Sequence, residues 1–268
     1  MHRRIDWYNP ADSPILHKLM SAILLIDQVP ETEQWEKMTE LWDTNALHDP
    51  ITSADLFCFH NQGLFEEDAR RITAYLVKHL KLDDSSHVLD LGGGMGRIAK
   101  YLAPQVAQYT LADISLEMLK QAQVRLKGIT NVRLIHLKRP VIPCDPGTFD
   151  ACIAVDLFQH LPQPTLREYF PIVASLLKPN GQFLFTTGLE PQDSQPKESD
   201  LKNADRLLGL LGLKTLPFGL LSTPLFEELV QSAGYRLAER GKDFPGCLPF
   251  LPFQIPFTGY FYRLRRLS

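Results

Sequence analysis

Residues 87–102 read HVLDLGGGMGRIAKYL, and this stretch decides the predicted fold. It begins as a short apolar strand, carries four glycines within residues 92–96, and continues with a helical pattern. Glycine lets the backbone adopt positive φ and lets a ligand approach the main chain, because no Cβ intervenes. A glycine-rich turn between a strand and a helix also directs helix N–H groups toward a ligand. The stretch therefore predicts a nucleotide-type binding loop, since a plain turn needs fewer glycines.

The chain of 268 residues alternates strand-like and helix-like patterns around this loop. Such alternation is typical of a parallel sheet covered by helices on both faces. We therefore predict an α/β fold with a seven-stranded, mostly parallel sheet. We expect a kink or a restart at Pro171 in one helix, and a turn at residues 178–181 before the fifth strand. The expected strands are 88–91, 109–112, 132–136, 149–155, 182–187, 235–242 and 260–267, and the expected helices are 69–80, 97–102, 116–126, 166–177 and 224–233.

The flanking segments predict additions to this domain. Residues 1–63 are expected to form an N-terminal helical cap, with helices at 14–26 and 32–41, ahead of a main domain at 64–268. Residues 190–222 interrupt the main domain after the fifth strand. This insertion is expected to form a substrate lid.

Composition and charge exclude several classes of function. A net charge of −3 and a pI near 6.2 provide no basic face for a nucleic acid. The four cysteines form no CxxC pair, so neither a disulfide framework nor a metal site is expected. The first residues lack the apolar stretch of a signal peptide. The early apolar run at residues 22–26 is far shorter than the roughly 20 residues that span a bilayer. We expect a cytoplasmic protein without stable membrane insertion, as a monomer or a homodimer.

The spacing of the glycines separates two kinds of nucleotide site. The dinucleotide fingerprint requires glycine at the first, third and sixth positions. Counted from Gly92, the third position is Gly94 but the sixth is Arg97. Counted from Gly93, the third position is Met95. The dinucleotide pattern is therefore absent, which disfavours an NAD-type oxidoreductase.

The pattern that is present, Asp90-x-Gly92-x-Gly94-x-Gly96, resembles the first motif of the class I S-adenosylmethionine (SAM)-dependent methyltransferases. The segments PGTFDACIAV, LFQHLP and LLKPNGQFLF also resemble that family, in the same order along the chain. The resemblance covers residues 64–242 and is strongest over 88–187. It implies a Rossmann-like fold with SAM as the cofactor. It also implies that Asp90 lies near the methionine amino end of SAM while the glycines line the ligand.

Other cofactor contacts are expected at the ends of the next strands. Asp113 lies 21 residues beyond Gly92, close to the roughly 20 expected for an acid that receives ribose hydroxyls. Asp113 could also act as a helix N-cap, and the two roles are compatible. The sequence DISLEMLKQAQ, which begins at Asp113, resembles the family's usual sequence after its ribose-binding acid, and this places Ile114 at the cofactor. Asp156 and Leu157 come directly after the fourth strand and are expected at the cofactor. Asp156 is expected to contact the methionine moiety or to orient a partner.

The adenine site departs from the family pattern. Many relatives carry an acid shortly after the third strand, where this chain has Leu137 and Lys138. Because the segment HLKRP contains no acid, main-chain groups or another side chain must serve the adenine there.

Two histidines are candidates for catalysis. Methyl transfer requires a nucleophile held in line with the C–S bond of SAM, and a general base only where that nucleophile must lose a proton. His160, just past the fourth strand, has a side chain that titrates near neutrality. A structural histidine is the alternative. His60, in the segment DLFCFHNQG, is the second candidate, with an ordinary polar loop as its alternative.

Two apolar stretches indicate the kind of methyl acceptor. Residues 207–221 and 244–261 are rich in leucine, aromatic residues and proline, as in a small-molecule pocket. The expected acceptor is a small hydrophobic or aromatic compound, such as a polyketide, phenolic or lipid-like product of secondary metabolism. Lid packing or a dimer face would leave the same pattern. VDLF stands where enzymes that methylate DNA bases carry an NPPY-type tetrad, which again disfavours nucleic acid. A SAM-binding regulator or scaffold without transfer activity also stays open.

Overall fold

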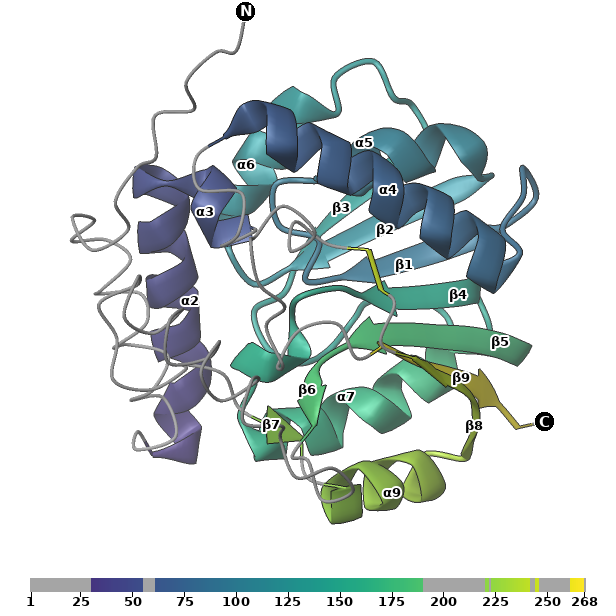
Figure 1. Cartoon of the computed structure of the whole chain (residues 1–268). Helices are drawn as coiled ribbons and strands as arrows, with labels where there is room; N and C mark the ends of the chain where they lie inside the picture. Colours follow the sequence, from purple (N-terminus) through teal and green to yellow (C-terminus); the bar gives the residue numbers. More distant parts are fainter. Residues whose placement is uncertain are drawn as a thin grey trace, which may run out of the picture.

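The computed structural model describes residues 30–54, 61–189, 220–221, 223–241, 244–245 and 261–267. The helix expected at 14–26, the candidate His60 and most of the lid expected at 190–222 lie outside these residues. Figure 1 shows a central sheet with helices on both sides of it.

The sheet has seven strands in the order β3-β2-β1-β4-β5-β9-β8. The first five strands along the chain pair in parallel, whereas β9 is antiparallel to both of its neighbours. This arrangement confirms the predicted seven-stranded, mostly parallel sheet. The strands are β1 (His87–Leu91), β2 (Gln108–Asp113), β3 (Val132–His136), β4 (Phe149–Ala154), β5 (Leu177–Thr186), β8 (Tyr235–Gly241) and β9 (Phe261–Arg266).

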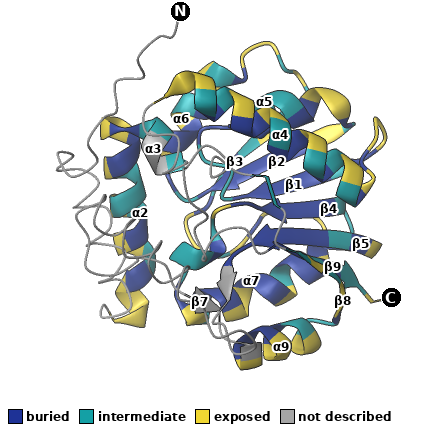
Figure 2. Ribbon diagram, viewed as in Figure 1, coloured by how far each residue is buried: buried dark blue, intermediate teal, exposed yellow. Residues whose placement is uncertain are grey.

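Helices cover both faces of the sheet, as predicted (Figure 1). The apolar sides of the helices and the strands form two cores, one on each face. Figure 2 shows the central strands almost entirely buried between these layers. One face carries α4 (Gln62–Leu80), α5 (Ala99–Leu102) and α6 (Leu116–Arg125), and the other carries α7 (Gln163–Leu176) and α9 (Thr223–Ser232).

An aromatic cluster fixes the segment after β4. The ring of Phe158 lies 5.7 Å from that of Phe170, 5.6 Å from that of Phe183 and 4.8 Å from that of Phe185. Such aromatic pairs contribute about 0.5–1.5 kcal/mol each beyond their buried area. Phe158 begins the short 3-10 helix η5 (Phe158–His160), so this packing holds the end of β4 against the core.

The structure of α7 and of the start of β5 differs from two local predictions. The helix was expected to kink or restart at Pro171, but it does not restart there, since α7 runs from Gln163 to Leu176 with Pro171 inside it. The packing of its buried face, which includes Phe170 and Val173, stabilises the helix by more than it loses with the backbone hydrogen bond that proline removes. The turn expected at residues 178–181 is instead part of β5, with an irregular register opposite β4 and Asn180 at φ 65°.

The N-terminal helix α2 (Glu31–His48) is longer than the expected helix at 32–41. With α3 (Pro50–Ala54), it stands across the edge of the sheet where the parallel strands end (Figure 1). At the bounds of the predicted insertion, β6 (Gly188–Leu189) and β7 (Leu220–Leu221) pair in parallel.

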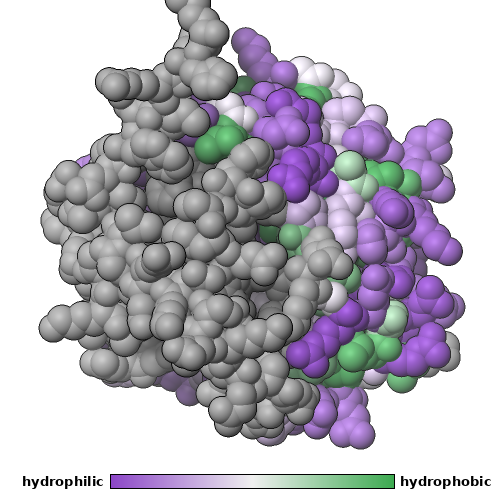
Figure 3. Space-filling model, viewed as in Figure 1, coloured by the Kyte–Doolittle hydropathy of each residue, from purple (hydrophilic) through white to green (hydrophobic). Residues whose placement is uncertain are grey.

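The described surface on the face shown in Figure 3 is mainly hydrophilic, with scattered hydrophobic residues. Among the described residues, no helix is both long and apolar enough to cross a membrane.

Candidate functional site

A cavity of about 920 Å³, including open solvent at its mouth, lies at the carboxyl ends of the parallel strands. Ligands of open α/β sheets bind at this edge. The sequence-predicted residues that line the cavity are Asp90, Gly92, Gly94, Asp113, Ile114, Leu137, Asp156, Leu157 and His160. Gly96 and Lys138 are not among the lining residues, and His60 lies outside the described chain.

The glycine loop has the left-handed backbone that its sequence predicts. Gly94 has φ 54°, and a Cβ there would meet nothing closer than the Met118 Sδ at 4.0 Å, so conformation and not space requires glycine. Gly96 has a different role. A Cβ at Gly96 would lie 3.0 Å from the Leu126 Cδ1, so this glycine packs the loop against the end of α6 instead of facing the cavity.

Asp113 joins the end of β2 to the glycine loop. Its Oδ2 accepts a hydrogen bond from the Gly94 N–H at 2.8 Å, and its Oδ1 accepts one from the Ser115 N–H at 2.8 Å. Burial raises the pKa of this carboxyl to about 6; the two N–H donors oppose that rise, and the negative charge of Asp43 adds to it. Asp113 is therefore largely ionised at pH 7 and can accept further hydrogen bonds.

Asp90 lies deeper, beside the same loop. The Tyr109 hydroxyl donates to its Oδ2 at 2.6 Å. Burial raises the pKa of Asp90 to about 7, and the neighbouring charge of Asp113 acts in the same direction. The two carboxyl groups thus make this end of the cavity acidic, and both can change protonation between pH 5 and 8.

Leu137 and Ile114 form the wall beside Asp113. The buried Leu137 lines the cavity, and its N–H donates to the Asp113 carbonyl at 2.8 Å. The carbonyl of Ile114 lies 3.0 Å from the His136 Nε2. Lys138 is exposed to solvent. Leu137 and Ile114 make this wall apolar.

Arg97 has a role that the sequence did not predict. Its Nη1 donates to the Asp68 Oδ2 at 2.6 Å, and its Nη2 donates to the Asp156 Oδ2 at 3.0 Å. Asp68 is fully buried on α4, whereas the Asp156 side chain is 46% exposed in the cavity. Asp156 also has φ 56°, a left-handed conformation that is uncommon for residues other than glycine but that aspartate adopts more often than most. Arg97 comes directly after the glycine motif, but its partners belong to distant elements and no local pattern identifies them.

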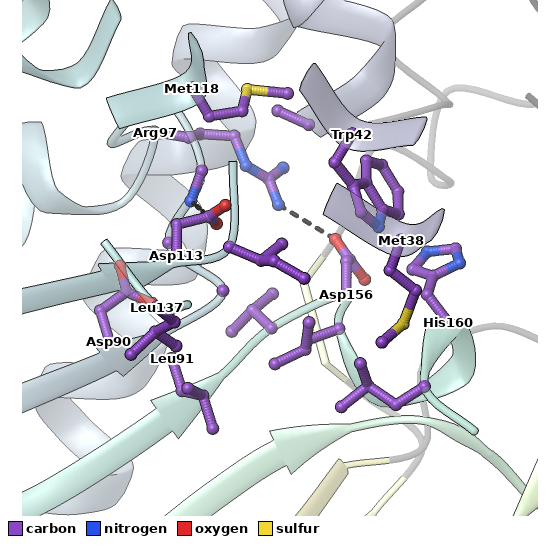
Figure 4. A pocket seen from close by; sticks show the side chains of 18 of the residues that line it. Met38, Trp42, Asp90, Leu91, Arg97, Asp113, Met118, Leu137, Asp156 and His160 are labelled. Carbon is purple, nitrogen blue, oxygen red and sulfur yellow. Dashed lines mark hydrogen bonds and ion pairs between the residues drawn. The ribbon is translucent and has the colours of Figure 1, made fainter. Parts of the chain in front are cut away.

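A second group of residues that were not predicted comes from α2. Trp35, Met38 and Trp42 line the cavity from this helix. Their spacing of three and four residues puts them on one helical face. This spacing is the sequence pattern from which they could have been predicted. The Trp35 ring lies 6.5 Å from the ring of Tyr169, another lining residue that was not predicted. Figure 4 shows Trp42 and Met38 across the cavity from Asp90, Asp113 and Leu137.

His160 lies on this aromatic side (Figure 4). Its ring packs edge to face against Trp42, with centroids 5.3 Å apart and an angle of 70° between the rings. Burial lowers the pKa of His160 to about 4, so its imidazole is neutral at physiological pH. Within the described ranges, no cluster of three or more His, Cys, Asp or Glu side chains could hold a metal ion.

The central part of the chain matches a known protein family. The family described as "Methyltransferase domain" matches residues 88–181, which include the glycine loop, Asp113 and Asp156. The chain carries a methyltransferase domain. This match, together with the strand order, confirms the resemblance to class I methyltransferases that the sequence predicts.

Curated relatives of the methyltransferase domain include two enzymes. The cyclopropane-fatty-acyl-phospholipid synthase of Escherichia coli is 32% identical over 113 residues, which are 42% of this chain and 28% of the synthase. The ubiquinone biosynthesis O-methyltransferase of Xanthomonas euvesicatoria pv. vesicatoria is 30% identical over 115 residues, which are 42% of this chain and 47% of that enzyme. The chain thus spans less than half the length of either relative.

Solved structures share the fold of the methyltransferase domain. Geranyl diphosphate C-methyltransferase from Streptomyces coelicolor A3(2), in complex with geranyl diphosphate, Mg²⁺ and S-adenosyl-L-homocysteine, superposes with a TM-score of 0.59. The likeness covers 88% of this chain and 98% of that one, at 15% sequence identity.

Proposed function

We propose that this protein transfers a methyl group from SAM to a small molecule. The observation that carries the proposal is a single cavity with two chemically different ends. Asp90, Asp113 and the glycine loop lie at one end, and the aromatic residues of α2 with His160 lie at the other. The acidic end suits a nucleoside with a positively charged sulfonium, and the aromatic end suits an acceptor.

The residues at the acidic end fit SAM. Asp113 is held in place by two N–H donors, so its remaining lone pairs can accept both hydroxyls of a ribose. The positive φ of Gly94 brings bare main chain to the cavity. Leu137 provides an apolar surface for a purine ring. When bound, SAM supplies an electrophilic methyl group on a positively charged sulfur.

The other lining residues position and shield the reacting groups. Trp35, Met38 and Trp42 exclude water from the aromatic end of the cavity, which lowers the local dielectric and strengthens the interactions that orient the acceptor. Arg97 holds Asp156 at the junction of the two ends (Figure 4). The proposed chemistry is an in-line displacement, so positioning is the main task of these residues.

His160 is proposed to contact the acceptor. A phenol has a pKa of about 10, so full proton transfer to an imidazole with a pKa of about 4 is uphill. Its neutral ring is better suited to accept a hydrogen bond that orients the nucleophile. A catalytic role for His60 remains a prediction from the sequence alone.

The acceptor is proposed to be hydrophobic or aromatic. Three kinds of observation support this: the aromatic face of α2, the apolar composition of residues 207–221 and 244–261, and the nature of the relatives. One relative is named for a fatty-acyl phospholipid, another for ubiquinone biosynthesis, and the solved structure contains geranyl diphosphate.

We also propose that residues 190–222 form a substrate lid and that residues 1–63 form a cap. A cytoplasmic location is proposed because the spacing of the four cysteines does not indicate a disulfide framework.

Two assays separate this proposal from its alternatives. Titration of the protein with S-adenosylhomocysteine (SAH) and with NADH, monitored by intrinsic fluorescence, distinguishes a methyltransferase from an oxidoreductase. A radiolabelled-methyl assay over a panel of phenolic, polyketide and lipid-like acceptors then tests transfer. Tight SAH binding without transfer to any acceptor would instead favour a SAM-binding regulator or scaffold.

A further inference from the structure

Asp43 makes an unusual contact between two helices. From α2, its Oδ1 accepts hydrogen bonds from the Ser115 Oγ at 2.6 Å and from the Glu117 N–H at 3.1 Å. Both donors belong to the start of α6, where backbone N–H groups have no partner within the helix. The Ser115 Oγ also accepts from the Met118 N–H, as an ordinary N-cap does. The carboxylate of α2 therefore completes the cap of α6.

The same serine links this contact to the cofactor end of the cavity. The Ser115 N–H donates to the Asp113 Oδ1, and the Asp113 Oδ2 accepts from the Gly94 N–H. Asp43 and Asp113 thus share Ser115, one binding its hydroxyl and the other its backbone. A continuous set of hydrogen bonds runs from α2 through α6 to the glycine loop.

This docking also places the aromatic side of the cavity. A second bond, from the Gln121 Nε2 to the Ala46 carbonyl at 2.7 Å, joins α6 to the last part of α2. The side chains of Trp35, Met38 and Trp42 reach the cavity from the same helix. The hydrogen bonds that hold α2 against α6 therefore also position Trp35, Met38 and Trp42, which form the wall of the cavity on the acceptor side (the acceptor wall).

We propose that Asp43 is a positioning residue that couples the docking of α2, and hence the acceptor wall, to occupation of the cofactor site at Asp113. This inference rests on the proposed function. Ribose hydroxyls that donate to Asp113 reduce the repulsion between its carboxylate and that of Asp43, so cofactor binding favours the docked helix. By thermodynamic reciprocity, a docked α2 strengthens cofactor binding by the same factor.

The charges around Asp113 define a measurable consequence. Asp43 faces it from α2 and raises its pKa, His136 on β3 lowers it, and Asp90 on β1 is a like charge nearby. If the negative charge of Asp43 is removed, the pKa of Asp113 falls. Cofactor binding that needs ionised Asp113 then persists to lower pH. A contact that only packs α2 against α6, without acting on the charge of Asp113, would not shift this pH profile.

The test uses the full chain with SAH as the probe. Hydrogen exchange of residues 31–48 and calorimetric SAH affinity between pH 5 and 8 are measured for the parent, Asp43→Asn, Asp43→Ala and a control, Lys37→Ala. Lys37 lies on the same helix in an exposed pair with Glu40, so its replacement leaves the contact with α6 intact. Thermal unfolding reports whether each variant is folded.

In the parent and in Lys37→Ala, SAH is expected to slow amide exchange in α2. Asp43→Ala should lose that protection and bind SAH about fivefold more weakly at pH 7, the low end of typical coupling. Asp43→Asn keeps an acceptor oxygen without the charge, so the pH midpoint of its SAH binding should move to lower pH. The inference is overturned if SAH leaves α2 exchange unchanged in the parent, or if Asp43→Asn has the midpoint of the parent. A parent that does not bind SAH overturns the proposed function as well.

Discussion

Arg97 and Asp156 form a 3.0 Å ion pair that ties the glycine loop to the carboxyl end of β4 inside the cavity. The same guanidinium binds the fully buried Asp68 of α4 at 2.6 Å. Three elements that are distant in sequence therefore depend on one side chain, and the shape of the cavity depends on their alignment.

Replacement of Arg97 should destabilise the protein strongly. Arg97→Met removes one partner of an ion pair with the fully buried Asp68 carboxylate, and breaking a buried pair in this way costs about 3–5 kcal/mol. Urea denaturation measures the free energy of unfolding. Lys37→Ala, which removes an exposed ion pair with Glu40, should stay within about 0.5 kcal/mol of the parent and serves as the control. Equal stability of Arg97→Met and the parent would contradict the structural role assigned to this network.

Cofactor affinity should depend on Asp113 and on pH. Asp113→Ala is expected to weaken SAH binding by more than about tenfold, because charge-assisted hydrogen bonds to the ribose are lost. In the parent, Asp113 with a pKa of about 6 is mostly ionised at pH 7 and mostly protonated at pH 5. SAH affinity should therefore fall about tenfold as the pH is lowered from 7 to 5. Calorimetry measures both effects, and an affinity that is unchanged by the substitution would remove Asp113 from the site.

The buried Asp90 should make the ligand-free protein less stable as the pH rises. Burial raises the folded-state pKa of Asp90 from 3.8 to about 7, so the folded state binds its proton more tightly than the unfolded chain does. The resulting stabilisation is complete below pH 3.8 and is lost as the pH rises toward 7, with a total on the order of 4 kcal/mol. The fall in the free energy of unfolding from pH 5 to pH 8, measured by urea denaturation, should be smaller in Asp90→Asn, in which Asp113 and His160 still contribute. The same pH dependence in the variant and the parent would assign the effect to other groups.

His160 should affect transfer more than cofactor binding. His160→Ala is expected to lower the transfer rate with SAH affinity nearly intact, because the ring lies on the aromatic side of the cavity away from Asp113. With a pKa of about 4, His160 should contribute no inflection to the rate between pH 6 and 8. Steady-state kinetics with an accepted substrate measure both. A variant as active as the parent would make the histidine a packing residue.

Local sequence patterns were enough to predict most of the fold and several of the residues that line the cavity. Alternating strands and helices predicted the seven-stranded sheet, and the spacing of the glycines from Asp113 predicted residues that do meet at one cavity. The pairing of Arg97 with Asp68 was not predictable, because the two residues lie on elements whose contact depends on the whole fold.

The N-terminal helix illustrates the same limit. A helical cap was predicted, but the face that α2 turns to the cavity depends on the hydrogen bonds that Asp43 and Ala46 accept from Ser115 and Gln121. At Pro171, the local rule against proline inside a helix was outweighed by tertiary packing of α7. Gly96 matched the motif but packs against Leu126, since position in a motif does not determine which way a residue faces.

The most direct test of the central claim is calorimetric titration of the purified protein with SAH at pH 7.5. We expect saturable binding to one site per chain, with Asp113→Ala more than about tenfold weaker and no comparable heat from NADH. Absence of SAH binding by the folded parent, or tighter binding of NADH, would contradict the claim.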